Sequence, residues 1–283
     1  MKRRDLIIGG GALALAGSAE AACATDRRDR RVNRMRGDCG SSGPPALPAG
    51  AIISLQASEI SGANMADVSS WDNGGTIADF TQASAIAYPK LLVNSDERAV
   101  NFDGVFDLLT STGSAAATGF VMSTGVFDLI LCLRRTNTTV GQERRICGNC
   151  EGQAGLFVGF NTDANTDGTF WVILGNGSGL INNYRTTARA PLGEPYKILI
   201  RGDGTQLRVS EDFSTFEDQA FGAALGAGSA FYDFSVGGAN PSQTTPRTLE
   251  ADVFDVLLYD RNLNAAELAA VQANLVAQVG TGI

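Results

Sequence analysis

The sequence predicts an all-β fold, in which two antiparallel sheets form a jelly-roll sandwich and one short helix follows at the C-terminal end. Short apolar segments, several of them alternating with period two, recur with no helical pattern between them. Turn-forming dipeptides such as Asn176-Gly177 and Asp203-Gly204 divide these segments, and the chain holds 34 glycines. The span exceeds the roughly 100 residues of an immunoglobulin-type domain, which favours a larger jelly roll.

The strand pattern is clearest in a set of segments spread over the body of the chain. These segments are 51–55, 99–102, 126–133, 156–160, 170–174, 196–201, 206–210, 231–236 and 253–259. Apolar residues make up 44% of the chain and charged residues 18%. The chain therefore has enough apolar material for a core, and its surface relies on Ser, Thr, Asn and Gly more than on charge.

One helix is predicted near the C-terminal end, over 264–279. Asn264 and Glu267 have the spacing of a capping box, in which each side chain bonds the backbone amide of the other residue. Apolar residues then repeat at helical spacing, at Leu268, Val271 and Leu275, and Gly280 ends the pattern. A helix with one apolar face is expected to pack on the edge of the sandwich.

Three parts are predicted along the chain: a signal peptide over 1–21, a disordered basic linker over 22–47 and a β-sandwich domain over 48–283. The apolar run at 6–17 is shorter than the roughly 20 residues that span a bilayer, so no transmembrane anchor is expected. The Arg3-Arg4 pair favours a twin-arginine export signal over a general secretory signal. The predicted location is periplasmic, extracellular or at the cell surface.

Charge and composition exclude several classes of function. Residues 1–40 carry a net charge of +4 and residues 41–283 one of −12. An acidic body repels phosphate backbones, so nucleic acid is not an expected partner. The chain contains no His, which excludes Ser-His-Asp and Cys-His catalysis and every His-ligated metal site.

Two groups of motifs resemble the laminin-G-like, concanavalin-A-like lectin/glucanase domains of secreted bacterial proteins and phage structural proteins. The opening motifs are Leu55-Gln56-Ala57, Trp71-Asp72-Asn73-Gly74-Gly75, Phe80-Thr81-Gln82, Pro89 and the stretch 99–104. The closing motifs are the stretch 251–263 and Ala266-Glu267. The resemblance spans roughly residues 50–280. It implies a concanavalin-A-like sandwich and names no ligand, because function depends on sites that differ among such folds.

A minority hypothesis makes the domain a glycoside hydrolase. Glu250, Asp252 and Asp255 resemble the carboxylate strand of jelly-roll glucanases. Such enzymes need two carboxyl groups held on either side of the scissile bond. Glu250 and Asp252 share a face of a strand, whereas Asp255 falls on the other face unless a bulge intervenes. The closing strand of the resembled family explains the same residues, so the sequence favours a protein without catalytic residues.

A calcium site is the best metal hypothesis. Asp163, Asn165 and Asp167, followed by Gly168, match the first half of an EF-hand-type loop. Leu174 stands where such a loop needs a bidentate Glu, and a plain polar hairpin turn is the favoured alternative. No cofactor is required, and Ca²⁺ is possible.

Aromatic and amide side chains suggest a carbohydrate contact. Trp71 lies in a structural motif and is expected in the core. Trp171 alternates out of phase with its apolar neighbours and can face solvent or a groove, which makes it the candidate for a glycan contact, although core packing is the favoured role even for Trp171. The other candidate contacts are nearby in sequence: Asn182, Asn183, Tyr184 and Arg185.

The cysteines predict a disulfide, because an exported chain permits one. A turn near 138–141 would place Cys132 about opposite Cys147, and this pairing is preferred. Cys147 with Cys150 is the alternative.

Together these features predict an exported recognition or adhesion module that binds carbohydrate or a cell-surface protein. A virion structural protein that assembles with other subunits is the alternative, and a glycoside hydrolase is the minority reading.

Overall fold

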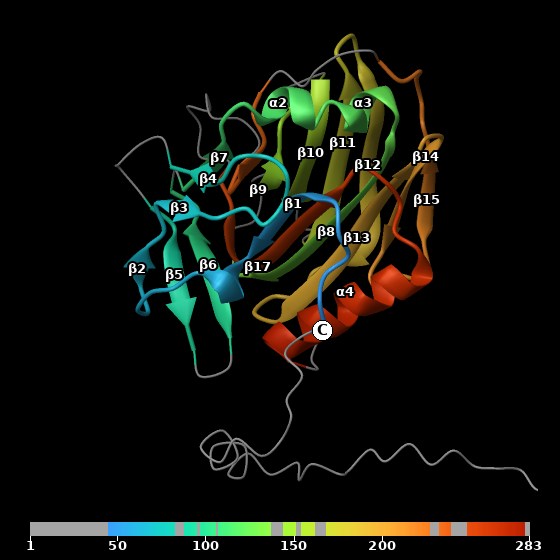
Figure 1. Cartoon of the computed structure of the whole chain (residues 1–283). Coiled ribbons are helices and arrows are strands. Elements are labelled where there is room, and N and C mark those ends of the chain that lie inside the picture. The colour runs from blue at the N-terminus through green and yellow to red at the C-terminus, as the bar shows by residue number, and fades with distance from the viewer. Residues whose placement is uncertain are drawn as a thin grey trace, which may run out of the picture. The chain divides into compact units, whose positions relative to one another are not determined.

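The computed structural model contains two antiparallel β-sheets and a C-terminal helix (Figure 1). The structure describes residues 45–82, 88–94, 97–105, 107–136, 144–150, 154–161, 168–226, 232–238 and 248–280. Contacts between Cα atoms group Pro44–Ile283 into one unit and Met1–Gly43 into another. The predicted signal peptide and most of the predicted linker lie outside the described residues.

The first sheet, sheet A, has nine strands. Across the sheet, the order is β15 (Glu217–Ala220), β14 (Gln206–Ser210), β13 (Pro195–Asp203), β8 (Val126–Arg135), β17 (Glu250–Tyr259), β6 (Arg98–Asp103), β5 (Lys90–Val93) and β2 (Ala66–Asp67). The ninth strand, β1 (Ala51–Gln56), pairs with the second half of β17, and β6 pairs with the first half.

The second sheet, sheet B, has eight strands. Their order is β12 (Leu180–Arg189), β11 (Thr169–Asn176), β10 (Ala154–Asn161), β9 (Arg144–Gly148), β16 (Ser235–Val236), β7 (Leu109–Ser111), β4 (Phe80–Thr81) and β3 (Ser70–Trp71). The all-β class and the two antiparallel sheets are thus confirmed.

The core lies between the sheets and is filled by alternate residues of each strand. On β10 and β11, Phe160 and Phe170 belong to this core, whereas Phe157 and Trp171 belong to a separate small cluster on the outer face of sheet B. Trp71 is 1% exposed and is part of the core, as expected from the sequence.

Three short helices were not predicted. They are the 3₁₀-helix η1 (Ala57–Glu59) and the α-helices α2 (Ser114–Ala117) and α3 (Phe120–Ser123). α3 contacts β8 of sheet A and β10 and β11 of sheet B, so it closes one end of the sandwich (Figure 1). None of the helices in the described part of the chain is both long and apolar enough to cross a membrane.

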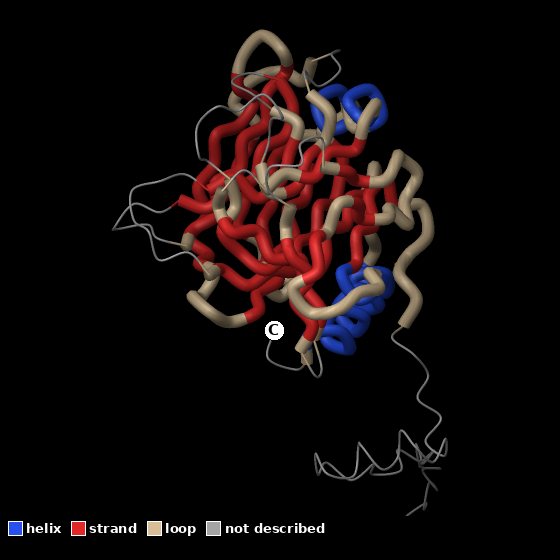
Figure 2. The backbone as a smooth tube through the Cα atoms, turned by 90° about the vertical axis from the view of Figure 1, so that its left-hand side faces the viewer, coloured by secondary structure: helices blue, strands red, loops and turns tan. Residues whose placement is uncertain are grey.

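Helix α4 (Ala265–Val279) packs on the outer face of sheet A, as Figures 1 and 2 show, and not on the edge of the sandwich. Its buried residues Leu268, Val271 and Leu275 form a second apolar cluster with outward-facing residues of sheet A. The predicted face is therefore confirmed, but its partner is a sheet face. Apolar residues on the outer face of sheet A, such as Phe254 and Leu257, must be shielded from water, and α4 covers them.

The capping box of α4 is formed as predicted. Asn264 Oδ1 accepts hydrogen bonds from the amide nitrogens of Ala266 and Glu267, both at 3.0 Å, and Glu267 Oε2 accepts one from the Asn264 amide nitrogen at 2.9 Å. Replacing Asn264 by Ala should lower the free energy of unfolding by about 1 kcal/mol, because two amide groups lose their acceptor. Urea denaturation measures this difference. Asn264→Ser keeps an acceptor and is the control, so an equal loss in both variants would contradict the capping role.

A buried ion pair stabilises the turn between β17 and α4. The Asp128 side chain of β8 is 0% exposed and accepts hydrogen bonds from Arg201 of β13, at 2.7 Å from Nε and 2.6 Å from Nη2. The Leu263 amide nitrogen donates to Asp128 Oδ2 at 2.8 Å, and Arg201 Nη2 donates to the Leu263 carbonyl at 2.8 Å. Asn262 Nδ2 also donates to Asp128 Oδ1 at 3.2 Å. The closing motif at 260–263 therefore sets where α4 begins.

Candidate functional site

Three of the predicted carbohydrate contacts lie together on the outer face of sheet B. Trp171 of β11 is the cross-strand partner of Arg185 on β12, and Ile173 is the partner of Asn183. Trp171 Nε1 donates to Asn183 Oδ1 at 2.6 Å, and the guanidinium carbon of Arg185 lies 5.1 Å from the centre of the indole ring. Asn183 and Arg185 are exposed, and Trp171 and Ile173 are half-buried. These four residues are called the β11–β12 patch below.

The indole ring of Trp171 is held by the neighbouring strand β10. The Phe157 ring meets it edge to face, with centroids 5.4 Å apart and planes at 79°. Gly159 is the cross-strand partner of Trp171, and a Cβ there would lie 2.7 Å from Phe157 Cζ. The missing side chain therefore leaves the room that the Phe157 ring takes. Phe157 is 2% exposed, so it supports Trp171 without being available to a ligand itself.

Asn182 and Tyr184 do not belong to this patch, which corrects the predicted grouping. They alternate with Asn183 and Arg185 along β12 and therefore face the inner side of sheet B. Asn182 Nδ2 donates to the Gln219 carbonyl at 3.4 Å, and the Tyr184 hydroxyl donates to Glu217 Oε2 at 2.6 Å. Burial and the Glu217 carboxylate raise the pKa of the Tyr184 hydroxyl.

Gln219 and Glu217 both belong to β15, the edge strand of sheet A. The bonds from Asn182 and Tyr184 therefore join the edge strands of the two sheets. Sequence alone could not separate these residues from Asn183 and Arg185, because which face of β12 is inner depends on its partner strand.

The strand of the minority catalytic hypothesis is β17, and it contains a bulge. Phe254 is an extra residue relative to β8, so the cross-strand partner of Asp255 is Cys132. Asp255 consequently lies on the outer face of sheet A with Asp252, and not on the opposite face as an unbroken strand would place it.

The other two carboxylates of β17 are engaged in ion pairs. Glu250 Oε2 lies 3.2 Å from Arg144 Nη2. Asp252 accepts hydrogen bonds from Asn101 Nδ2 at 2.7 Å and from Arg134 Nη1 at 3.4 Å, and its side chain is 6% exposed. Glu250 therefore joins β17 to β9 of sheet B, whereas Asp252 joins β17 to its neighbours β6 and β8 in sheet A.

Asp255 carries a fully buried carboxyl group with few hydrogen-bond partners. It is 0% exposed, its Oδ1 lies 3.5 Å from Gln56 Nε2, and its Oδ2 has no hydrogen-bond partner among the described residues. Burial raises the pKa of this carboxyl to about 7. Hydrogen bonds from Gln56 and Gln278 act in the opposite direction, and the nearby charge of Glu59 adds to the rise.

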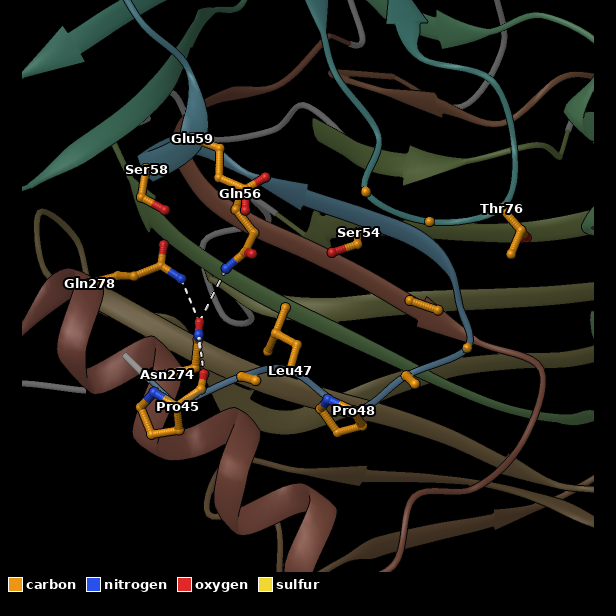
Figure 3. Close-up of a pocket in the computed structure, with 16 residues that line it drawn as sticks. Pro45, Leu47, Pro48, Ser54, Gln56, Ser58, Glu59, Thr76, Asn274 and Gln278 are labelled. Carbon is orange, nitrogen blue, oxygen red and sulfur yellow. Dashed lines mark hydrogen bonds between the residues drawn. The ribbon is translucent and has the colours of Figure 1, made fainter. Parts of the chain in front are cut away.

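A pocket of about 720 Å³ lies next to Gln56, between β1, α4 and the segment 45–50 (Figure 3). Its lining residues are Pro45, Ala46, Leu47, Pro48, Ala49, Gly50, Ala51, Ser54, Gln56, Ser58, Glu59, Gly74, Gly75, Thr76, Asn274 and Gln278. We call it the β1–α4 pocket.

Three side-chain amides are joined at one end of this pocket, as the dashed lines of Figure 3 show. Asn274 Oδ1 accepts hydrogen bonds from Gln278 Nε2 at 2.5 Å and from Gln56 Nε2 at 3.2 Å. Asn274 Nδ2 donates to the Pro45 carbonyl at 2.8 Å, which ties the segment 45–50 to α4.

The opposite wall of the pocket is the loop that follows β3. Asn73 Oδ1 accepts hydrogen bonds from the amide nitrogens of Ser54, at 2.7 Å, and Gly75, at 3.1 Å. A Cβ at Gly75 would lie 2.3 Å from the Ile52 carbonyl oxygen, so only glycine lets the loop approach β1 this closely. The motif at 71–75 therefore packs Trp71 into the core and holds a wall of the pocket.

The pocket residues were not predicted from the sequence, although the buried face of α4 contains amide side chains that point to a polar neighbour. Val271, Asn274, Leu275 and Gln278 share one face of the helix at spacings of three and four residues. Two amides on an otherwise apolar face need polar partners, and Gln56 is one of them.

No disulfide joins Cys132, Cys147 and Cys150, so the predicted bridge is wrong in this structure. Cys132 lies on β8 of sheet A among the residues that pack against α4, whereas Cys147 lies on β9 of sheet B in the core between the sheets. The predicted Cys132–Cys147 bridge requires neighbouring strands of one sheet, but β8 and β9 belong to different sheets.

The predicted calcium ligands Asp163, Asn165 and Asp167 lie outside the described residues. Within the described residues, no group of three or more Asp, Glu or Cys side chains is arranged to hold a metal ion.

No family model and no curated protein matches this chain. Solved structures do match. Domain 4 of AbnA, an extracellular GH43 arabinanase from Geobacillus stearothermophilus, was solved with arabinotriose. It matches 81% of this chain and 98% of its own length, with 12% identity and a TM-score of 0.54.

Two further structures have similar folds. The sialidase of Trypanosoma rangeli, in complex with 2,3-difluorosialic acid, matches 87% of this chain with 18% identity and a TM-score of 0.54. This chain spans 36% of the sialidase chain. The binding domain of botulinum neurotoxin DC, in complex with SialylT, matches 80% of this chain and 52% of its own, with 9% identity and a TM-score of 0.50. At these identities the similarity shows the fold alone, one that occurs in carbohydrate-binding and carbohydrate-active proteins.

Proposed function

We propose that this protein is an exported carbohydrate-recognition module of the laminin-G-like, concanavalin-A-like type, with jelly-roll strand order, and that it binds a saccharide on the β11–β12 patch. The observation that carries the proposal is the half-buried Trp171 ring, which Phe157 holds in place, with the exposed Arg185 guanidinium over the ring and exposed Asn183 bonded to its Nε1. An aromatic face accepts the C–H face of a sugar ring, while amide and guanidinium groups bond its hydroxyls. The carbohydrate-related proteins of similar fold support the ligand class.

We further propose that the protein binds without cleaving its ligand. Glycoside hydrolysis needs two carboxyl groups that reach opposite sides of one glycosidic bond. Glu250 and Asp252 are ion-paired with Arg144 and Arg134, and Asp255 is fully buried. These contacts support a structural role for the carboxylates of β17. Incubation of the purified protein with polysaccharides should therefore release no reducing sugar.

Replacing Trp171 by Ala should weaken saccharide binding at least tenfold, because the ligand loses the only large aromatic surface among the described residues of the patch. The ligand would first be selected on a glycan array that includes arabinan and sialylated oligosaccharides. Isothermal titration of the best ligand then compares the variant with the natural protein.

Tyr184→Phe is the matched control. It alters an aromatic residue on the neighbouring strand β12 that faces the inner side of sheet B, so the affinity should not change. Binding that survives Trp171→Ala, or that Tyr184→Phe abolishes, would remove the patch from the proposal. An array on which no glycan binds would overturn the proposed function itself.

A further inference from the structure

The β1–α4 pocket presents polar groups that the fold itself does not use. Among the described residues, the hydrogen bonds of Gln56 and Gln278 run through their Nε2 atoms, and none uses Oε1 of either side chain. The hydroxyl groups of Ser58 and Thr76 line the same space (Figure 3). We propose that this pocket is a second saccharide site, selective for sugar units that carry no negative charge.

The chemistry of the lining fits hydroxyl groups. A sugar hydroxyl both donates and accepts a hydrogen bond, so it needs acceptors and donors side by side. Amide oxygens of Gln56 and Gln278 offer acceptors, while Ser58 and Thr76 offer groups that do either. Leu47 and two prolines supply apolar surface for the ring carbons.

The charge of the pocket selects against anions. Glu59 is the only charged side chain among its described lining residues, and the carboxyl of Asp255 lies directly behind Gln56. No Lys or Arg is among the described residues that line the pocket, so a carboxylated, sulfated or phosphorylated ligand would meet the negative charge of Glu59 without a cation among these residues to pair with. A neutral sugar meets no such repulsion, and an amine-bearing sugar can pair with Glu59.

The pocket is formed before any ligand arrives. The Asn274–Pro45 hydrogen bond fixes one wall, and Asn73 fixes the other by bonding Ser54 and Gly75. A site that is already ordered spares a ligand the cost of ordering it. The volume of about 720 Å³ lies in the usual range for small-molecule sites, roughly 300–1,000 Å³.

This second site goes beyond the proposed function, because the pocket shares no residue with the β11–β12 patch. The side-chain amide signals of Gln56, Asn274 and Gln278 in nitrogen–proton correlation spectra provide a local readout. Methyl glucoside, glucosamine and glucuronate, titrated at equal concentrations, differ in charge and little in shape. The first two sugars should shift these signals, and glucuronate should bind at least tenfold more weakly than glucosamine.

Two variants at exposed positions test the location. Ser58→Trp fills the mouth of the pocket and should abolish the shifts, whereas Ser123→Trp on α3 makes the same change at another exposed serine and should preserve them. Glu59→Lys reverses the only charge among the described lining residues and should make glucuronate bind more tightly than glucosamine.

Different results would contradict the β11–β12 patch and the β1–α4 pocket. Trp171→Ala should weaken glycan-array binding and leave the pocket signals responsive. Array binding that survives Trp171→Ala, with intact pocket shifts, would therefore count against the patch alone. The pocket proposal is overturned if none of the three sugars moves the amide signals. It is equally overturned if the shifts persist in Ser58→Trp or if glucuronate binds as tightly as glucosamine.

Discussion

Replacing Asp255 by Asn should raise the free energy of unfolding at pH 8 by about 4 kcal/mol and should change it by less than about 1 kcal/mol at pH 4. Burial raises the pKa of Asp255 from the ordinary 3.8 to about 7, a difference of about three units at roughly 1.4 kcal/mol each. Asn has nearly the shape of the protonated acid, and its oxygen can still accept the hydrogen bond from Gln56.

Whether stability rises or falls with pH depends on whether the folded or the unfolded state holds the proton of Asp255. Between pH 4 and pH 7 the folded protein keeps Asp255 protonated while the unfolded chain has lost the proton. Stability contributed by this group is therefore full below the unfolded pKa and falls as the pH rises, until the folded pKa is passed. Above pH 7 the folded state contains a buried carboxylate whose Oδ2 has no partner among the described residues.

Urea denaturation of both proteins at several pH values between 4 and 8 measures the difference. Asp212→Asn is a control of opposite sign, because hydrogen bonds from the amides of Thr215 and Ser214 lower the pKa of that carboxyl. Its loss of stability should stay nearly constant from pH 4 to pH 8, because a carboxyl with a lowered pKa loses its contribution only as the pH falls below the ordinary value of 3.8. A difference between Asp255→Asn and the natural protein that stays constant from pH 4 to pH 8 would contradict the buried-acid assignment.

Replacing Asp128 by Ala should lower the free energy of unfolding by about 3–5 kcal/mol, because Arg201 is left largely buried without its counter-charge. The Leu263 amide nitrogen loses its acceptor at the same time, and the start of α4 loses its attachment to β8. Urea denaturation at neutral pH measures the loss.

Asp218→Ala is the matched control, because it removes the carboxylate of another cross-strand Arg–Asp pair in sheet A. The Arg208–Asp218 pair is 32% and 44% exposed, and exposed pairs contribute about 0–1 kcal/mol. Equal losses in the two variants would show that burial is not what makes Asp128 important.

Local patterns in the sequence determined the class of the fold and several elements. Short apolar segments, several of them alternating with period two, predicted β1, β6, β8, β10, β11, β13, β14 and β17, because a strand needs apolar residues on each face that it buries. The Asn264–Glu267 capping box predicted the start of α4, since both bonds join residues three positions apart. The same local pattern correctly placed Trp171 on the face opposite to Phe170.

Only the tertiary structure decided which elements meet. The polar strand β12 was missed because its sequence, rich in Asn, Thr and Arg, has no clear alternation, and it is a strand because it pairs with β11. Cys132 and Cys147 are fifteen positions apart in the chain, yet their strands belong to different sheets, so the disulfide prediction failed.

The residues that meet at each site were likewise decided only by the tertiary structure. The bulge at Phe254 appears only in the register between β17 and β8, and it carries Asp255 to the side of Gln56 and α4. The β1–α4 pocket joins Gln56 to Asn274, which is 218 positions away. Strand alternation and helix caps depend on neighbours in the sequence, whereas sheet order, bulges and pockets depend on contacts between distant segments, which only the folded chain brings together.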